Sequence, residues 1–143
     1  MKKALLLLLL SFPALAQEEA EIKKTIDGFF TAMRTSDSTA LRSFVAKGAK
    51  FQTISADFSV KTDAPDGFIA SVGKAPKGAL DERISYESIK IDGALASVWT
   101  PYSFYLNGKF SHCGVNSFSL VKKEGKWQIA HVIDTRRKDN CKG

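Results

Sequence analysis

Three short turn signals divide the second half of the chain into segments in which apolar and polar residues alternate. The signals are the dipeptides Asp92-Gly93, Asn107-Gly108 and Glu124-Gly125. The segments that they bound have the period of a β-strand and cover residues 84–91, 94–106, 110–121 and 127–135. Because loops this short join neighbouring antiparallel strands, the pattern predicts a four-stranded antiparallel meander.

The first half of the chain has helical periodicity instead. From Glu18 to Arg34, apolar residues recur along one stripe of a helix, at Ile22, Ile26, Phe29, Phe30 and Met33. A second, shorter helix is expected to begin at Asp37 or Ser38 and to end near Gly48, and it carries Leu41, Phe44 and Val45. A short strand over residues 51–55 is expected to follow it.

A third helix is expected after this strand, with Asp63 as its N-cap and Pro65 in its first turn. Phe68, Ile69 and Val72 form its buried side. Helices followed by a bent sheet predict an α+β fold, in which the helices cover one face of the sheet.

The turns also determine which residues face one another, because a two-residue loop sets the register of its strands. Counting outward from the turns places Trp99 opposite Tyr86 and Asn116, and Phe118 opposite His131. The bulky face expected to meet the helices contains Tyr86, Leu95, Trp99, Asn116, Phe118, Leu120, Ile129, His131 and Ile133. The opposite face, expected to pack against a second copy in a homodimer, contains Ala96, Val98, Thr100, Val115, Ser117, Ala130, Val132 and Asp134.

One position makes this register uncertain in advance. Thr100-Pro101 falls in the middle of a predicted strand, and a proline there usually marks a bulge or an edge. A bulge at this point would reverse the facing of Tyr102 and Phe104.

The N-terminus has the order of a secretory signal: Lys2 and Lys3, the apolar run of residues 4–10, and then Ala14-Leu15-Ala16. Cleavage after Ala16 is expected to leave one domain, residues 17–143, in the periplasm or outside the cell, without a membrane anchor. The net charge falls from +6 to +4, because 19 Lys and Arg remain against 15 Asp and Glu. Without a dense basic stripe, nucleic acid is not an expected partner.

Two cysteines remain in the exported domain, Cys113 and Cys141. An oxidising compartment favours a disulfide between them, and the alternative is a pair of free thiols. His112 and Cys113 are adjacent on a predicted strand, so their side chains point to opposite faces and do not form a metal or nucleophile pair. No metal and no cofactor is expected.

Several segments together resemble one known superfamily. They are Ser97-Val98-Trp99-Thr100-Pro101-Tyr102, Phe104-Tyr105-Leu106-Asn107-Gly108, Ser111-His112-Cys113-Gly114 and Asp134-Thr135-Arg136-Arg137, with Phe29-Phe30 on the first helix. The chain resembles the nuclear transport factor 2-like superfamily and, within it, the bacterial putative lumazine-binding group. This resemblance implies a cone-shaped roll of the cystatin-like kind, a pocket inside the cone and frequent dimerisation. Relatives include ketosteroid isomerase, scytalone dehydratase and many binding domains, so the fold does not determine the function.

The predicted register places a candidate ligand site on the bulky face. His131 and Asn116 lie there among large apolar side chains, and a buried imidazole or amide without a partner costs about 1–3 kcal/mol. They either orient a planar ligand stacked on Trp99 or Tyr86, or satisfy each other and the helix ends. The expected ligand-binding residues are Tyr86, Trp99, Tyr102, Asn116, Phe118, His131 and Arg136.

Arg136 can act in more than one way. It can pair with Asp134, which points to the same side, or meet Tyr102 across the sheet and so close the meander beside a Cys113–Cys141 link. At a pocket mouth it would instead favour an anionic ligand.

These features predict an exported domain that binds a small, largely apolar or aromatic molecule. The alternative is a proton-transfer isomerase or dehydratase similar to ketosteroid isomerase, without a metal. His131 or His112 would then be its base.

Overall fold

The structure is a computed structural model that describes residues 11–142. Its helices are α1 (Ser11–Arg34), α2 (Ser38–Ser43) and α3 (Pro65–Lys74). Its strands are β1 (Val45–Ile54), β2 (Val60–Asp63), β3 (Leu80–Ile84), β4 (Ser88–Asp92), β5 (Leu95–Leu106), β6 (Lys109–Lys123) and β7 (Lys126–Thr135). The greater part of the expected signal, residues 1–10, lies outside the described residues, so the signal stays a prediction.

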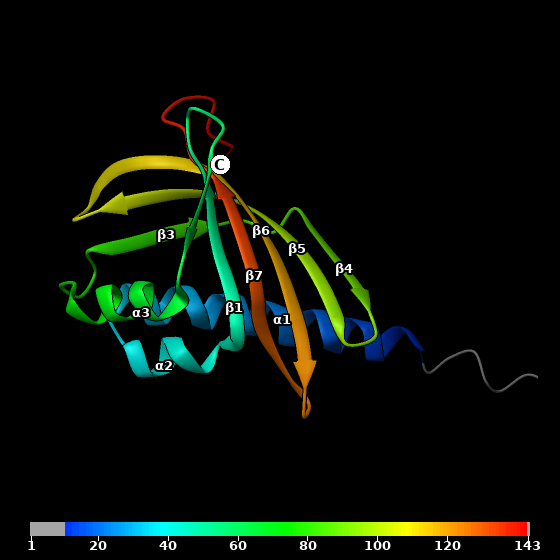
Figure 1. Cartoon of the computed structure of the whole chain (residues 1–143). Coiled ribbons are helices and arrows are strands. Elements are labelled where there is room, and N and C mark those ends of the chain that lie inside the picture. The colour runs from blue at the N-terminus through cyan, green and yellow to red at the C-terminus, as the bar shows by residue number, and fades with distance from the viewer. Residues whose placement is uncertain (1–10, 143) are drawn as a thin grey trace, which may run out of the picture.

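The strands form one mixed sheet in the order β2-β1-β7-β6-β5-β3, with β4 also paired to β5. The expected meander is present, because β5, β6 and β7 are consecutive antiparallel neighbours. The sheet is not wholly antiparallel, however, because β1 runs parallel to β7. Figure 1 shows the sheet curving over α1 and α3, which lie on its concave side.

The helices cover the concave face through the apolar stripe expected from the sequence. Ile22 and Ile26 of α1 are fully buried, and they pack in one core with Val98, Phe118 and Ile129 of the sheet. The predicted α+β fold, with N-terminal helices covering one face of a bent sheet, is therefore confirmed.

The second helix is shorter than expected, and the strand after it is longer. α2 ends at Ser43, and β1 begins at Val45 rather than at residue 51. The extra strand residues are held by pairing with β7, since Ile129 N donates to Phe44 O at 2.8 Å and Val45 faces Ile129. A contact this distant in sequence leaves no periodic signal, and β2 and β3 were not predicted as separate strands either.

The predicted register of the meander is wrong by one residue, because each hairpin contains a β-bulge. Between β5 and β6, Phe104 faces His112 but Tyr105 faces Phe110, which leaves Ser111 unpaired. Between β6 and β7, Ser119 faces His131 but Leu120 faces Ile129, which leaves Ala130 unpaired. One extra residue reverses the facing of everything beyond it.

The two bulges change which side chains lie inside. Trp99 pairs with Ser117 rather than Asn116, and Phe118 pairs with Val132 rather than His131. The concave face therefore carries Ala96, Val98, Thr100, Asn116, Phe118, Leu120, Ile129, Val132 and Asp134. Trp99, His131 and Ile133 lie on the convex face instead, where Trp99 is 42% exposed.

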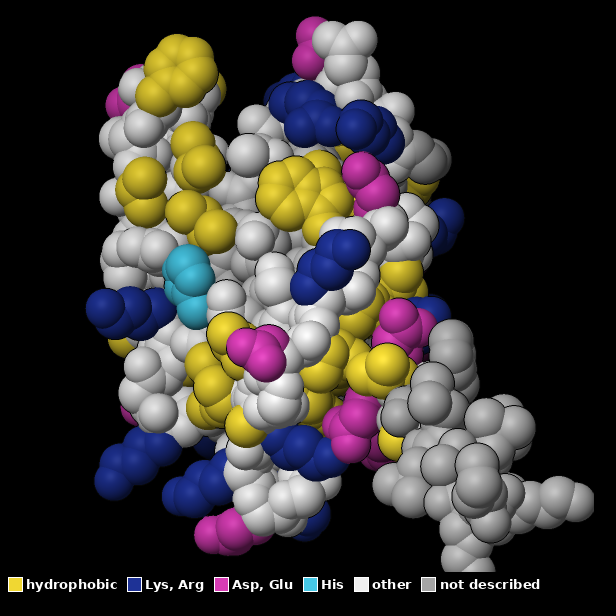
Figure 2. Space-filling view, turned by 90° about the vertical axis from the view of Figure 1, so that its right-hand side faces the viewer, with side chains coloured by type: hydrophobic (Ala, Val, Ile, Leu, Met, Phe, Trp, Pro, Cys, Tyr) yellow, Lys and Arg dark blue, Asp and Glu magenta, His cyan; other side chains and the backbone are white. Residues whose placement is uncertain are grey.

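The sequence predicts a convex face of mostly small side chains, suited to packing in a homodimer. The convex face carries large and polar side chains as well. Figure 2 views the molecule from the right-hand side of Figure 1, where apolar groups are interspersed with basic and acidic ones and a partly buried histidine reaches the surface. The homodimer itself stays a prediction.

Thr100-Pro101 causes no bulge, because Thr100 faces Asn116 and Pro101 faces Val115 in an unbroken register. The proline is tolerated because the neighbouring edge is interrupted there. β3 ends at Ile84, β4 begins at Ser88, and Ser85 N donates to Pro101 O between them at 3.0 Å. Pro101 has no N–H to donate, and the side of the strand on which it would donate faces this break, so no hydrogen bond of a continuous ladder is lost.

The turn before β5 lies one residue later than expected. Asp92 pairs with Leu95, so the loop is Gly93-Ala94 rather than Asp92-Gly93. Trp99 therefore faces Ser88, and Tyr86 falls in the short link between β3 and β4.

The predicted disulfide is confirmed: Cys113 and Cys141 are bonded, with their Cα atoms 5.7 Å apart. It holds the segment after β7 against β6, where Cys113 and Arg137 exchange two backbone hydrogen bonds of 2.8 Å. Within residues 11–142, no helix has the length and apolar character needed to span a membrane.

Candidate functional site

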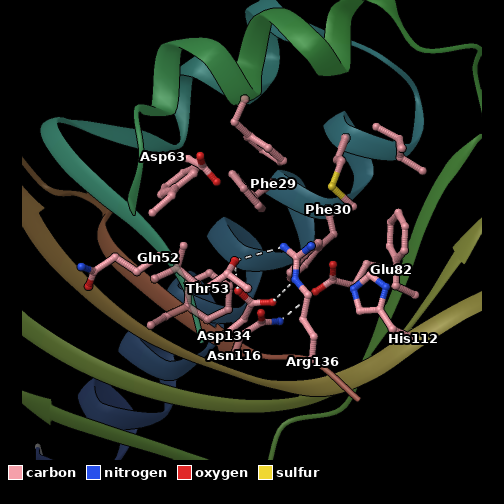
Figure 3. Close-up of a pocket in the computed structure, with 17 residues that line it drawn as sticks. Phe29, Phe30, Gln52, Thr53, Asp63, Glu82, His112, Asn116, Asp134 and Arg136 are labelled. Atoms are coloured by element: carbon pink, nitrogen blue, oxygen red, sulfur yellow. Dashed lines mark hydrogen bonds and ion pairs between the residues drawn. The ribbon is translucent and has the colours of Figure 1, made fainter. Parts of the chain in front are cut away.

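A cavity of about 310 Å³ opens between the helices and the concave face of the sheet. Most of its wall is apolar and comes from Phe29, Phe30, Met33, Phe51, Phe68, Leu80, Phe104, Phe118 and Val132. Polar side chains gather at one end, as Figure 3 shows: Thr53, Glu82, His112, Asn116, Asp134 and Arg136. A small apolar cavity with a few convergent polar groups is typical of a small-molecule site.

Three aromatic side chains from three elements form one side of this wall. The ring of Phe29 on α1 stacks on Phe68 of α3, with ring centres 6.1 Å apart. Phe51 of β1 meets both rings edge-on, at 6.1 Å from Phe29 and 5.5 Å from Phe68. Such pairs add about 0.5–1.5 kcal/mol each beyond area burial, so this wall is formed by the fold before any ligand binds.

Asp134 of β7 anchors the polar end. Its Oδ1 accepts from Thr53 Oγ1 at 2.5 Å, and its Oδ2 accepts from Arg136 Nε at 2.9 Å. The Tyr102 hydroxyl lies 3.1 Å from the same Oδ2 and 2.9 Å from the Thr135 carbonyl. Asp134 is 9% exposed, and its charge is balanced by the ion pair with Arg136.

Asp134 and Thr53 hold Arg136 in place but engage only part of its hydrogen-bonding capacity. Its Nε donates to Asp134 and its Nη2 donates to Thr53 Oγ1 at 3.1 Å. A guanidinium has five N–H groups, and the other three have no hydrogen-bond partner within the described residues. Because Arg136 lines the cavity and its side chain is 53% exposed, these groups are accessible to a molecule inside it.

Glu82 of β3 is the second carboxyl group of the polar end. Its Oε1 accepts from Asn116 Nδ2 at 2.8 Å, and that amide also lies 3.4 Å from Thr100 Oγ1. Burial raises the pKa of Glu82 to about 7, the Asn116 hydrogen bond opposes this rise, and the negative charge of Asp134 adds to it. Near neutral pH, the Glu82 carboxyl group therefore exchanges readily between its charged and its protonated form.

His112 of β6 lies beside Glu82 and Arg136 in Figure 3. Its ring meets Tyr102 edge-on at 5.8 Å and lies tilted against Phe104 at 5.0 Å. Burial, together with the nearby charge of Arg136, lowers its pKa below 6.5. Its Nδ1 pairs with Ser111 Oγ at 3.0 Å, which leaves Nε2 for the cavity.

Four of the eight residues that the sequence offers as ligand-binding or catalytic candidates line this cavity: Asn116, Phe118, Arg136 and His112. The predicted Asp134–Arg136 ion pair is present, and Tyr102 joins it from β5. Tyr102 supports the site through its hydroxyl without being part of the cavity lining.

The structure places the other three candidates elsewhere. Trp99 and His131 lie on the convex face, and His131 Nε2 pairs there with Gln52 Oε1 at 2.8 Å. The Tyr86 hydroxyl pairs with Asp27 of α1 at 2.8 Å, away from the cavity. The ligand-binding roles of all seven residues stay predictions.

Two important residues of the polar end were missed. Asp134 was assigned to the opposite face, because the two bulges lie between the turns and this residue. Glu82 lies in β3, whose sequence Leu80-Asp81-Glu82-Arg83-Ile84 has too many charged residues to suggest a pocket wall. No sequence signal marks either bulge, whereas the Phe29-Phe30 pair was visible as part of the helical stripe.

Within the described part of the chain, no cluster of three or more His, Cys, Asp or Glu side chains is placed to hold a metal ion.

Residues 17–132 match a protein family described as putative lumazine-binding. The chain belongs to this family. No curated protein matches the sequence.

Three solved structures with the same architecture are distantly related to this chain in sequence. A nuclear transport factor 2-like protein of unknown function from Shewanella baltica is 18% identical, with a TM-score of 0.70 over 87% of this chain and 97% of that one. A protein of unknown function from Mycobacterium tuberculosis is 14% identical, with a TM-score of 0.68 over 91% of this chain and 78% of that one. A domain of unknown function with a cystatin-like fold from Nostoc punctiforme is also 14% identical, with a TM-score of 0.68 over 87% and 80%. At these identities the likeness establishes the nuclear transport factor 2-like, cystatin-like fold alone.

Proposed function

We propose that this family member is an exported domain that binds one small, mostly apolar molecule inside its cone. The observation that carries the proposal is the cavity itself, in which an aromatic wall ends at a cluster of fixed polar groups. A cavity of about 310 Å³ lies at the lower end of the size range of small-molecule sites. The disulfide supports a location in an oxidising compartment, in agreement with the expected signal.

The chemistry of the wall supports a ligand with a flat apolar body. Phe29, Phe51 and Phe68 offer ring faces and edges, and burying an aromatic body against them is favourable by about 25 cal/mol per Å². Most of the polar groups lie at one end, and Gln52 and Asp63 line other parts of the cavity. The cluster at that end would determine the orientation of the ligand more than its affinity.

The test is to purify the protein from the periplasm with its disulfide formed and to measure which molecules remain bound by native mass spectrometry. A thermal-shift screen of heterocycles, steroids and lipids follows, and lumazine is included because the family description names it. A bound small molecule, or a raised unfolding temperature with one chemical class, is the expected result. A cavity that stays empty with every class would contradict the proposal.

A matched pair of variants locates the binding. Leu80 lines the cavity, whereas Leu106, which faces Leu80 across the β3–β5 ladder, lies outside it. Leu80→Trp fills the cavity and is expected to abolish binding, whereas Leu106→Trp makes the same chemical change outside it and is expected to leave binding intact. Equal loss in both variants would place the bound molecule elsewhere.

A second candidate function is proton transfer, as in an isomerase or dehydratase. It is favoured by the placement of His112 beside Glu82, whose pKa of about 7 suits a general acid or base. Of the two histidines considered in the sequence, His112 lines the cavity and His131 does not. If turnover of a bound ligand is found, Glu82→Gln and His112→Gln are each expected to reduce kcat by about 100-fold or more. Unchanged kcat in both variants would exclude this candidate.

A further inference from the structure

The polar end of the cavity presents two unlike groups side by side. Arg136 offers only N–H donors, three of them without a partner in the described residues. Glu82 offers one carboxyl oxygen, Oε2, that has no donor among residues 11–142, since Asn116 occupies Oε1. Figure 3 shows the two side chains next to each other below the aromatic wall.

The two groups do not satisfy each other. The ion pair of Arg136 is formed with Asp134, and none within 4.0 Å joins Arg136 to Glu82 in the described part of the chain. Both oxygens of Asp134 already accept hydrogen bonds, Oδ1 from Thr53 and Oδ2 from Tyr102 and Arg136, so rotating toward a ligand would break these bonds. The unsatisfied donors of Arg136 and the unsatisfied oxygen of Glu82 are therefore left to whatever fills the cavity.

The charges at this end argue against ligands that carry a single charge. Asp134 balances Arg136, and burial lowers the pKa of His112, which favours its neutral form. An anionic ligand facing Arg136 would bring a second negative charge against Glu82. A cationic ligand facing Glu82 would leave the Arg136 donors buried without acceptors and repelled by its charge. Leaving such groups unpaired on binding costs about 1–3 kcal/mol, and more when the group is charged.

We infer that Arg136 and Glu82 together select a neutral ligand whose polar edge carries a carbonyl oxygen next to an N–H group, as in a primary amide or a lactam. The carbonyl oxygen accepts from Arg136, and the N–H donates to Glu82. Asp134 is the positioning residue that fixes Arg136 and cancels its charge. This inference rests on the proposed function and adds to it the chemical class of the ligand.

The test uses four probes with the same flat apolar body: naphthalene, 2-naphthamide, 2-naphthoate and 2-naphthylmethylamine. Binding to the full exported protein is measured by calorimetry at about pH 8, where Glu82 is mostly charged. The amide is expected to bind at least about tenfold more tightly than either the carboxylate or the ammonium compound.

The four probes distinguish failure of the proposed small-molecule binding from failure of the proposed ligand class. If naphthalene and its three derivatives all fail to bind, the proposed small-molecule function loses its support, and so does this inference. If naphthalene binds but the amide gains nothing over the carboxylate or the ammonium compound, the cavity binds ligands and only the inference is overturned.

Glu82→Gln provides a sharper test, because the glutamine can keep the Asn116 bond through its Oε1 while offering the cavity an NH2 group in place of an acceptor. The polar end then presents donors only, so 2-naphthoate is expected to bind at least about tenfold more tightly than to the natural protein, and the amide to lose its advantage. Glu87→Gln makes the same change at an exposed position outside the cavity lining and is expected to alter neither affinity. Unchanged affinities in a folded Glu82→Gln variant would overturn the inference.

Lowering the pH imitates this variant in the natural protein. At about pH 5.5 Glu82 is protonated, so the affinity for 2-naphthoate is expected to rise about tenfold relative to pH 8. The natural protein and the variant share the other charged or titratable groups around Glu82, namely Asp27, Arg34, Asp81, Arg83, Tyr102, His112, Asp134 and Arg136. If the pH effect persists in Glu82→Gln, one of these groups causes it and not Glu82.

Discussion

Tyr102 on β5 lies directly opposite Gly114 on β6, and this pair supports the polar end of the cavity. A Cβ atom at Gly114 would lie 1.8 Å from the Thr135 carbonyl oxygen and 3.0 Å from Tyr102 Cε1. The bare glycine lets the Tyr102 ring and β7 approach closely enough for the hydroxyl to reach Asp134. The position of Arg136 in the cavity thus depends on the absence of a side chain on a neighbouring strand.

Gly114→Ala is expected to destabilise the protein by roughly 3 kcal/mol, because the methyl group meets backbone atoms that cannot move aside cheaply. The free energy of unfolding in denaturant measures this. Gly67→Ala in α3 is the control, since nothing lies within 4 Å of a Cβ there, and it is expected to be neutral or stabilising by about 0.5 kcal/mol. Equal effects of the two substitutions would disprove the close approach at Gly114.

Cys141→Ser removes the disulfide by changing its exposed member. In the chain-entropy model, a link across 28 residues contributes about 3–4 kcal/mol, so a loss of that size in the free energy of unfolding is expected. The natural protein should fall to the stability of the variant when a reductant is added, and the variant itself should not respond. A variant that is destabilised further by reductant would contradict this account.

Glu82 should make the protein more stable as the pH falls from about 8 to about 5. Its folded pKa of about 7 lies above its ordinary value of 4.5, so between these values the folded protein binds a proton that the unfolded chain does not. The gain is present at low pH and is lost as the pH rises through 7, on the order of 2 kcal/mol.

Comparison with Glu82→Gln isolates this contribution. The lowered pKa of His112 acts in the opposite direction below pH 6.5, but it acts in both proteins and cancels in their difference. Unfolding by urea at several pH values measures how the difference in stability between the two proteins changes with pH. If Glu82 titrates at its ordinary pKa, this difference should stay constant.

Asp134→Asn should cost about 2 kcal/mol of stability, because it weakens the bonds from Thr53 and Tyr102 to a buried carboxylate and removes the ion pair with the half-exposed Arg136. Asp63→Asn changes an exposed carboxylate that also lines the cavity, and it is expected to cost less than about 0.5 kcal/mol.

A double-mutant cycle with Arg136→Gln tests the ion pair itself. The double variant is expected to lose less stability than the two single variants combined, by about 1 kcal/mol or more. Strict additivity would show that the two charges do not depend on each other.

The site was only partly predictable, and the reason is specific. The turn signals at Asn107-Gly108 and Glu124-Gly125 predict two hairpins, and the strands that they join are paired as expected. Ser111 and Ala130, however, look like ordinary strand residues, and each adds the one residue that reverses a face. For this reason Trp99 and His131 lie on the convex face and not on the predicted inner face, and Asp134 lies on the concave face and not on the predicted outer face.

The sequence by itself determined the elements whose causes are local: the apolar stripe of α1, the hairpin turns and the pairing of two cysteines in a chain whose N-terminus predicts export. Their signals are periodicity, turn chemistry and composition, which do not depend on the rest of the fold. Only the tertiary structure decided that β1 runs beside β7, where the bulges fall, and that Glu82, Asp134 and Arg136 share one cavity. Bulge positions and contacts between distant segments are set by how the helices and the sheet pack together, and that packing leaves no mark in the spacing of residues along the chain.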